Sequence, residues 1–181
     1  MSSVKTSLAV WGSLALASAG AATKPAPPAV TEAPMTASET AYNTEIFNLL
    51  LPGKSLVDGK VHYNPRFARS VDALLAQSGY ARLGKPGTAQ AFLKKRLLSG
   101  PAAKPRSVAL QTGTPATPSY LYYRACQAHA CDVTNLALLY QPASQRMVAL
   151  LRIDGQSEHL GQPGSAERAL LTALDAAQER P

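Results

Sequence analysis

The sequence predicts an α+β fold, in which an antiparallel meander sheet of about five strands is flanked by helices in α/β/α layers. Apolar stripes with a helical period occupy the first half of the chain, and short segments rich in Val, Leu and Tyr, separated by turns, follow it. Strands joined by tight turns favour antiparallel neighbours, and helices on both sides of a run of strands give an α+β domain. The hydrophobic content of 46% and charged content of 16% are typical of a globular chain.

The N-terminus has the pattern of a secretory signal peptide over residues 1–21. An apolar run from Leu8 to Ala17 is too short to span a bilayer, and small residues follow it. We therefore expect export to the periplasm and no membrane span. Residues 22–37 are rich in Ala, Pro and Thr, and they are expected to form a disordered linker.

Three helices are expected next, two of them in an N-terminal helical segment over 38–87. The first covers about 38–50 and starts with a capping box at Thr36. The second covers about 65–78 with Asn64 as its cap, and the third starts at a Thr88 cap. The stripes expected to face the core are Tyr42, Ile46, Leu49 and Leu50, then Phe67, Val71, Leu74 and Leu75, then Ala89, Phe92, Leu93 and Leu97.

The strands come after these helices. They are expected at Val108–Thr112, Ser119–Ala125, Asp132–Tyr140 and Arg146–Ile153, with a weaker fifth strand at Gln156–Leu160. A last helix, capped by Ser165, directs Leu170, Leu171 and Leu174 inward. Helices before and after the strands would cover the sheet.

The two cysteines of the chain lie in the connection between the second and third expected strands. The stretch reads Cys126, Gln127, Ala128, His129, Ala130, Cys131. A disulfide between the two cysteines can close this short loop, and an exported protein meets an oxidising environment. Closing so short a loop contributes about 2 kcal/mol, and a hairpin already holds its ends together. The bridge is therefore expected to shape a protruding loop, with His129 near the tip, that suits insertion into a cleft.

The residues around this loop resemble a known family. The string Tyr123-Arg124-Ala125-Cys126-Gln127-Ala128-His129-Ala130-Cys131 lies between two strands and is followed by a hairpin and a helix. It is similar to the Ivy family, the bacterial inhibitors of vertebrate (C-type) lysozyme. In that family a disulfide-closed Cys-Lys-Pro-His-Asp-Cys loop enters the lysozyme active site, where its histidine meets the two catalytic carboxylates. Gln127, Ala128 and Ala130 depart from that pattern.

The resemblance implies an Ivy-like domain over residues 88–181 and a function as a periplasmic inhibitor, not an enzyme. The implied partner is a C-type lysozyme or one of the cell's own lytic transglycosylases, and the family's members are dimers, which implies a homodimer. One imidazole can hydrogen-bond through both ring nitrogens, so His129 could occupy both carboxyl groups of a muramidase. No cofactor is implied.

Other readings of the loop stay open at this point. It could be a thiol–disulfide or metal-binding element of an envelope protein, or a structural hairpin with a solvent-facing histidine. A metal site would need further ligands, and neither His62 nor His159 has motif spacing to the loop. The chain also has no recognisable catalytic motif.

The charge of the chain limits its partners. The formal net charge is +7, and residues 54–106 hold eleven Lys or Arg against two Asp. Vertebrate lysozymes are generally basic, so long-range attraction to such a partner would be weak or repulsive. The basic run Lys94–Arg96 is interpreted as the solvated side of its helix. Nucleic acid is not expected as a partner of an exported chain without a stacking motif.

Overall fold

The computed structural model describes residues 30–54, 56–83, 87–110 and 118–178. The expected signal peptide, residues 1–21, and residues 22–29 of the expected linker lie outside these ranges. Within them, no helix is both long enough and apolar enough to cross a membrane.

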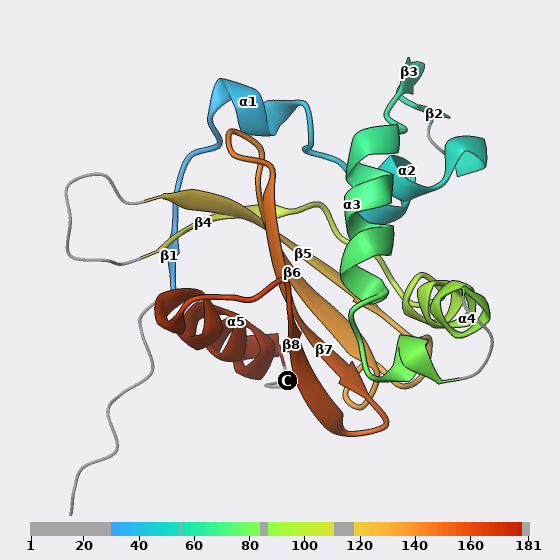
Figure 1. The fold of residues 1–181 in the computed structure, drawn as a ribbon. Helices are drawn as coiled ribbons and strands as arrows, with labels where there is room; N and C mark the ends of the chain where they lie inside the picture. Colours follow the sequence, from blue (N-terminus) through green and yellow to red (C-terminus); the bar gives the residue numbers. More distant parts are fainter. Residues whose placement is uncertain (1–29, 55, 84–86, 111–117, 179–181) are drawn as a thin grey trace, which may run out of the picture.

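A six-stranded antiparallel sheet forms the middle of the molecule (Figure 1). Its strands, in spatial order, are β1 (Thr31–Glu32), β4 (Arg106–Ala109), β5 (Ser119–Cys126), β6 (Asn135–Gln141), β7 (Arg146–Ile153) and β8 (Gln156–Leu160). From β4 to β8 each strand pairs with the next along the chain, so the expected meander is confirmed. A small second sheet pairs β2 (Leu56–Val57) with β3 (Lys60–Val61).

The sixth strand, β1, comes from the segment expected to be a disordered linker. Thr31 pairs with Ala109 and Glu32 pairs with Val108. An ion pair between Glu32 and Arg106, with an N–O distance of 2.9 Å, joins the same two strands. A two-residue strand shows no alternation that a sequence pattern could reveal.

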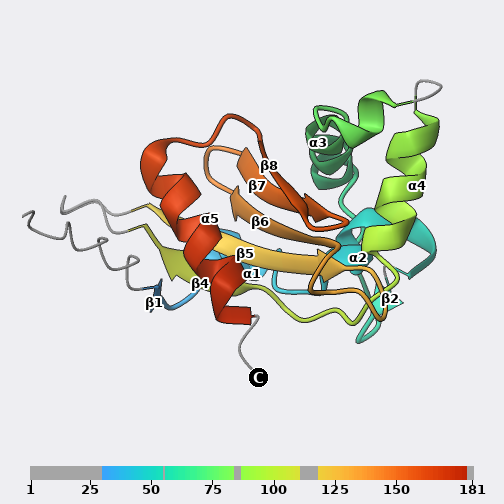
Figure 2. The same ribbon diagram turned by 90° about the horizontal axis from the view of Figure 1, so that it is seen from below.

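Helices cover both faces of the sheet. They are α1 (Ala37–Thr40), α2 (Ile46–Leu50), α3 (Pro65–Leu75), α4 (Thr88–Leu97) and α5 (Ser165–Gln178), with short 3₁₀ turns at Pro52–Lys54 and Tyr80–Arg82. Figure 2 shows α5 on one face and α2, α3 and α4 on the other. The expected α/β/α layering is therefore confirmed.

The alternation of side chains along β5 divides the core between these faces. Leu121, Tyr123 and Ala125 pack with the buried residues of α2, α3 and α4, whereas Tyr120 and Tyr122 pack with α5. Phe67 of α3 lies in the first cluster, with its ring centroid 5.5 Å from that of Tyr123. The helices of the 38–87 segment thus share one core with the sheet.

The helix expected over about 38–50 is two helices, because residues 41–45 form turns. Tyr42 donates its amide to Glu39, and the Thr44 amide donates back to Tyr42. The Tyr42 carbonyl also accepts the hydroxyl of Tyr123 at 2.6 Å, a tertiary bond that fixes the turn. The expected capping contact is present, since the Thr36 amide donates to Glu39 Oε2 at 2.8 Å.

The starts of the later helices are partly as expected. Asn64 caps α3 by accepting the amides of Arg66 at 3.1 Å and Phe67 at 3.0 Å, and α3 ends at Leu75 instead of residue 78. The expected caps at Thr88 and Ser165 are wrong. Each is the first residue of its helix, and Gly87, with φ of 80°, precedes Thr88.

Phe92 was expected to face the core, and this expectation is wrong. Leu93 and Leu97 of α4 are buried, but Phe92 is 54% exposed. Its ring lies 6.0 Å from the guanidinium carbon of Arg96. Neighbouring residues of an α-helix point about 100° apart, so Phe92 faces solvent although Leu93 beside it is buried.

The buried and exposed phenylalanines give a matched test of the shared core. Phe67→Ala should lower the free energy of unfolding by about 3–5 kcal/mol, because it leaves a cavity beside Tyr123 and Tyr140. Phe92→Ala should lower it by at most about 1 kcal/mol. Urea unfolding followed by circular dichroism measures both. Similar losses in the two variants would contradict the assignment of α3 to the core.

The ion pair between Arg146 and Glu167 predicts a pH dependence of stability. Arg146 donates to both carboxylate oxygens at 2.6 Å, and the Tyr120 hydroxyl donates to Oε1 at 2.8 Å. These bonds, led by those from Arg146, lower the pKa of Glu167 to about 2 from its ordinary value of 4.5. The stabilisation is thus present above about pH 4.5 and is lost as the pH falls towards 2.

Between about pH 5 and pH 2, the free energy of unfolding of the wild type should therefore fall by roughly 2–3 kcal/mol more than that of Glu167→Gln. Denaturant melts at several pH values in this range measure the slope. An unchanged slope in the variant would show that the pair does not link protonation to folding.

Candidate functional site

The disulfide lies at the end of the central strand pair. Cys126 is the last residue of β5 and lies opposite Asn135, the first residue of β6. It is bonded to Cys131, with a Cα–Cα distance of 4.9 Å. The expected bridge is therefore confirmed, and it closes a loop whose first cysteine is 2% exposed.

The connection is longer than expected, because β6 begins at Asn135 instead of Asp132. The Gln127 amide donates to the Thr134 carbonyl at 3.0 Å across the base of the connection. Within it, the Ala130 carbonyl accepts the amides of Val133 at 3.2 Å and Thr134 at 2.8 Å. Backbone bonds therefore brace the loop at Ala130, where the family pattern has Asp.

His129 occupies the turn inside the disulfide loop. Its φ of 62° is in the left-handed region, which His adopts more readily than most residues. The side chain is exposed, and no hydrogen bond to its ring occurs among the described residues. Both ring nitrogens are thus available to a partner.

Arg96 of α4 anchors the loop from the side. Its Nε donates to Gln127 Oε1 at 2.7 Å, and a terminal nitrogen donates to Asp154 Oδ1 at 2.9 Å and to Thr134 Oγ1 at 3.3 Å. The hydrogen bond with Asp154 raises the pKa of Arg96, so the guanidinium stays charged. One side chain thus ties the disulfide loop, the start of β6 and the β7–β8 turn together.

Arg96 could not be identified from the sequence, because a basic run is typical of a solvated helix face. Arg96 has a side-chain exposure of only 19%, although Lys95 beside it is exposed. All three of its partners lie more than thirty residues away along the chain. No local spacing signals such contacts.

The end of α4 also contacts the loop through Ser99 and Gly100. Ser99 Oγ accepts the amide of Ala128 at 3.0 Å, and the Gly100 amide donates to the Cys126 carbonyl at 2.8 Å. A Cβ atom at Gly100 would lie 2.5 Å from that carbonyl oxygen and 2.8 Å from the Cys126 sulfur. Only glycine lets the backbone approach the disulfide this closely.

The far side of the loop is held through carbonyl groups. The Cys131 carbonyl accepts from Asn135 Nδ2 at 2.9 Å and from Arg124 at 3.2 Å, and Arg152 donates to the Asp132 carbonyl at 3.0 Å. No group of three or more His, Cys, Asp or Glu residues that could hold a metal is found in the part of the chain that the structure describes. His159 lies away from the loop, on the edge strand β8 opposite Leu150.

The sequence was compared with models of known protein families. The family described as inhibitor of vertebrate lysozyme (Ivy) matches residues 89–179, about half of the chain. The chain belongs to the Ivy family. The match contains α4, the strands from β4 to β8, the disulfide loop and α5. Searches of curated proteins and of solved structures gave no match.

The Ivy match leaves out α2 and α3, which supply much of one face of the core. It includes every residue of the disulfide loop and its anchors Arg96, Ser99 and Gly100. A homodimer and a lytic transglycosylase partner stay predictions, as does the division of the chain at residue 88.

The close approach at Gly100 predicts a position-specific effect. Gly100→Ala should lower the free energy of unfolding by about 1–3 kcal/mol, because its Cβ would overlap the Cys126 carbonyl and sulfur. Gly53→Ala is the matched control, since no atom lies within 4 Å of the added Cβ there. Thermal melts of both variants measure the difference. A Gly100→Ala protein as stable as Gly53→Ala would contradict the packing of α4 on the disulfide.

Proposed function

We propose that this protein is an exported inhibitor of a C-type lysozyme, which inserts the Cys126–Cys131 loop into the active site of its target. The observation that carries the proposal is the loop itself. His129 presents an exposed ring without a partner among the described residues, on a turn that is fixed at both ends. Membership of a family of lysozyme inhibitors supports the choice of target.

The loop is suited to insertion because it is ordered before contact. The disulfide, the Arg96–Gln127 bond and the Ser99–Ala128 bond restrict the loop at three points. A binding segment that is already ordered avoids the entropy cost of ordering at the moment of association. The rigid backbone would hold the imidazole in one position in the cleft.

The chemistry of the target matches an imidazole. Retaining glycosidases of the lysozyme kind use two carboxyl groups about 5 Å apart, one as the acid and one as the nucleophile or stabiliser. The two nitrogens of His129 point in different directions from one ring, so each can face one carboxyl group. The inserted loop would exclude sugar and water together.

Exposed apolar side chains flank the loop and would contact the rim of the cleft. Phe92 is 54% exposed and Val133 is 40% exposed. Phe92 lies against Arg96, which bonds to the loop, and Val133 follows the disulfide and is held by the Gly155 amide at 3.0 Å. Aromatic and aliphatic side chains around a central anchor are common at protein interfaces.

The binding energy would come from this local fit more than from long-range attraction. The protein has a formal net charge of +7, so a basic lysozyme gains no electrostatic steering. Arg96, one of the cations bonded to the loop, is paired with Asp154. We therefore expect an ordinary association rate and a slow dissociation rate.

His129 should be a hot spot of the interface, contributing a large part of the binding free energy. Replacing it with Ala should weaken inhibition of a C-type lysozyme by about 30- to 1000-fold, because both hydrogen bonds to the carboxyl pair are lost. Lysis of bacterial cell walls at a series of inhibitor concentrations measures this. His62→Ala is the matched control, since His62 follows β3, at the far end of the molecule from the loop in Figure 1.

A second variant distinguishes the effect of losing the imidazole ring from the effect of straining the backbone at residue 129. Gly adopts a φ near 62° without strain whereas Ala does not, so His129→Gly and His129→Ala should lose inhibition equally if the ring carries the effect. Full inhibition by both variants would remove His129 from the mechanism. No inhibition by the wild type would exclude C-type lysozyme as the target.

A further inference from the structure

A groove lies between the 3₁₀ turn that follows α3 and the strands β7 and β8. It has a volume of about 400 Å³, which is within the range of ligand pockets, roughly 300–1,000 Å³. Its walls are mainly apolar and include Tyr80, Leu83 and Ile153. The carboxylates of Asp154 and Glu158 also line it. Leu83 is 67% exposed, so the groove presents an apolar side chain to solvent.

The groove is adjacent to the loop that is proposed to enter the target. At the β7–β8 turn, the Gly155 amide donates to the Val133 carbonyl in the β5–β6 connection at 3.0 Å. Arg96 donates both to Asp154, which lines the groove, and to Gln127 of the loop. Figure 2 shows the β5–β6 connection and the β7–β8 turn at the same end of the sheet, beside α4. A protein that receives the loop in its cleft would therefore also lie against the groove.

One carboxylate of the groove is not neutralised by an ion pair within the described residues. Asp154 is paired with Arg96 at 2.9 Å, whereas Glu158 takes part in none of the ion pairs found there. The Gly79 amide donates to both Glu158 oxygens, at 3.0 and 3.2 Å, and this holds the carboxylate at the groove wall. No Lys or Arg is among the described residues that line the groove. The groove is therefore a local negative site.

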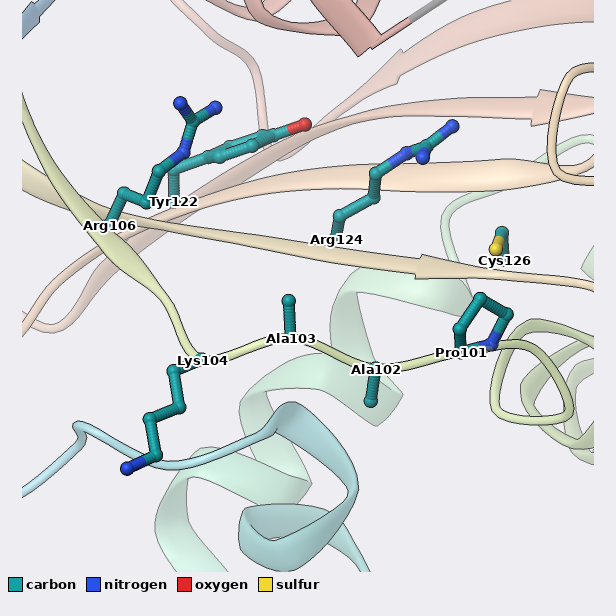
Figure 3. A pocket seen from close by; sticks show the side chains of 8 residues that line it. All are labelled: Pro101, Ala102, Ala103, Lys104, Arg106, Tyr122, Arg124 and Cys126. Atoms are coloured by element: carbon teal, nitrogen blue, oxygen red, sulfur yellow. The ribbon is translucent and has the colours of Figure 1, made fainter. Parts of the chain in front are cut away.

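Another pocket at this end of the sheet, beside Cys126, has the opposite charge. It has a volume of about 230 Å³ and lies between the segment that follows α4 and the strands β4 and β5 (Figure 3). Lys104, Arg106 and Arg124 line it, and no Asp or Glu is among the described residues of its lining. A cationic group of a partner would therefore be repelled by this pocket and attracted to the groove.

We propose that the groove binds a cationic side chain, Arg or Lys, of the lysozyme whose active site receives the His129 loop. This inference rests on the proposed function, because vertebrate lysozymes are generally basic and the occupant is one of their basic residues. The alkyl stem would pack on Leu83 and Ile153, and the charged end would pair with Glu158 and lie near the Tyr80 ring. The groove would thus provide local charge complementarity in an inhibitor whose formal net charge is +7.

Calorimetric titration of a C-type lysozyme with the purified protein and its variants tests this inference. Glu158→Gln should weaken the affinity by roughly three- to tenfold, because it removes the charge but keeps an oxygen that can accept the Gly79 amide. Asp58→Asn is the matched control, since it removes the same charge from the exposed turn of the β2–β3 hairpin and should change the affinity by less than about twofold. Raising the salt concentration from about 0.05 M to about 0.5 M should reduce the difference between the wild type and Glu158→Gln.

A second pair of variants tests the apolar wall. Leu83→Ala should weaken the affinity by roughly threefold or more, because the partner would bury this side chain. Leu56→Ala is the matched control, since Leu56 is also 67% exposed. It lies in the β2–β3 hairpin, which precedes α3, whereas Leu83 follows that helix (Figure 1). Leu56→Ala should leave the affinity within about twofold of the wild type, because the bound lysozyme would not reach it.

Melting curves check that each variant is folded. If the wild type binds the lysozyme but neither groove variant is weaker than its control, the inference is overturned and the proposed function stands. No binding of the lysozyme by the wild type would overturn both.

Discussion

The antiparallel pairing of β5 with β6 is the constraint on which the other features depend. It runs from Leu121 opposite Tyr140 to Cys126 opposite Asn135, and both strands are buried on both faces. A strand pair without a solvated face needs helices above and below it, which α3 and α5 supply. The disulfide loop begins where this pairing ends, so the most buried part of the molecule orients the exposed His129.

Much of this arrangement could be predicted from the sequence, because it depends on local patterns. The limits of β7 and β8 were predicted to the residue, and so was the Asn64 cap. The errors have tertiary causes. The first helix breaks where the Tyr42 carbonyl binds Tyr123, and β1 exists only through its pairing with β4. In the loop, the cysteines and His129 could be predicted, whereas Arg96 could not, because its partners come from three distant segments.

The Ivy match and the physical domain do not have the same limits. The match begins at residue 89, but Phe67 and Leu75 are each only 1% exposed and belong to the core. The helices of the 38–87 segment therefore act as one layer of the folded unit. The matched half contains the loop and its anchors. The unmatched helices bury one face of β5 and β6. This division agrees with a functional loop supported by a scaffold that can differ between relatives.

The proposed mechanism requires that the His129 loop and the substrate occupy the same place in a lysozyme. Calorimetric titration of a C-type lysozyme with this protein, with and without a saturating chitooligosaccharide in the catalytic cleft, measures this most directly. The saccharide should weaken the apparent affinity by a factor of one plus the ratio of its free concentration to its own dissociation constant. Binding of equal affinity in the presence of the saccharide would contradict it, because the loop and the sugar would then occupy different sites.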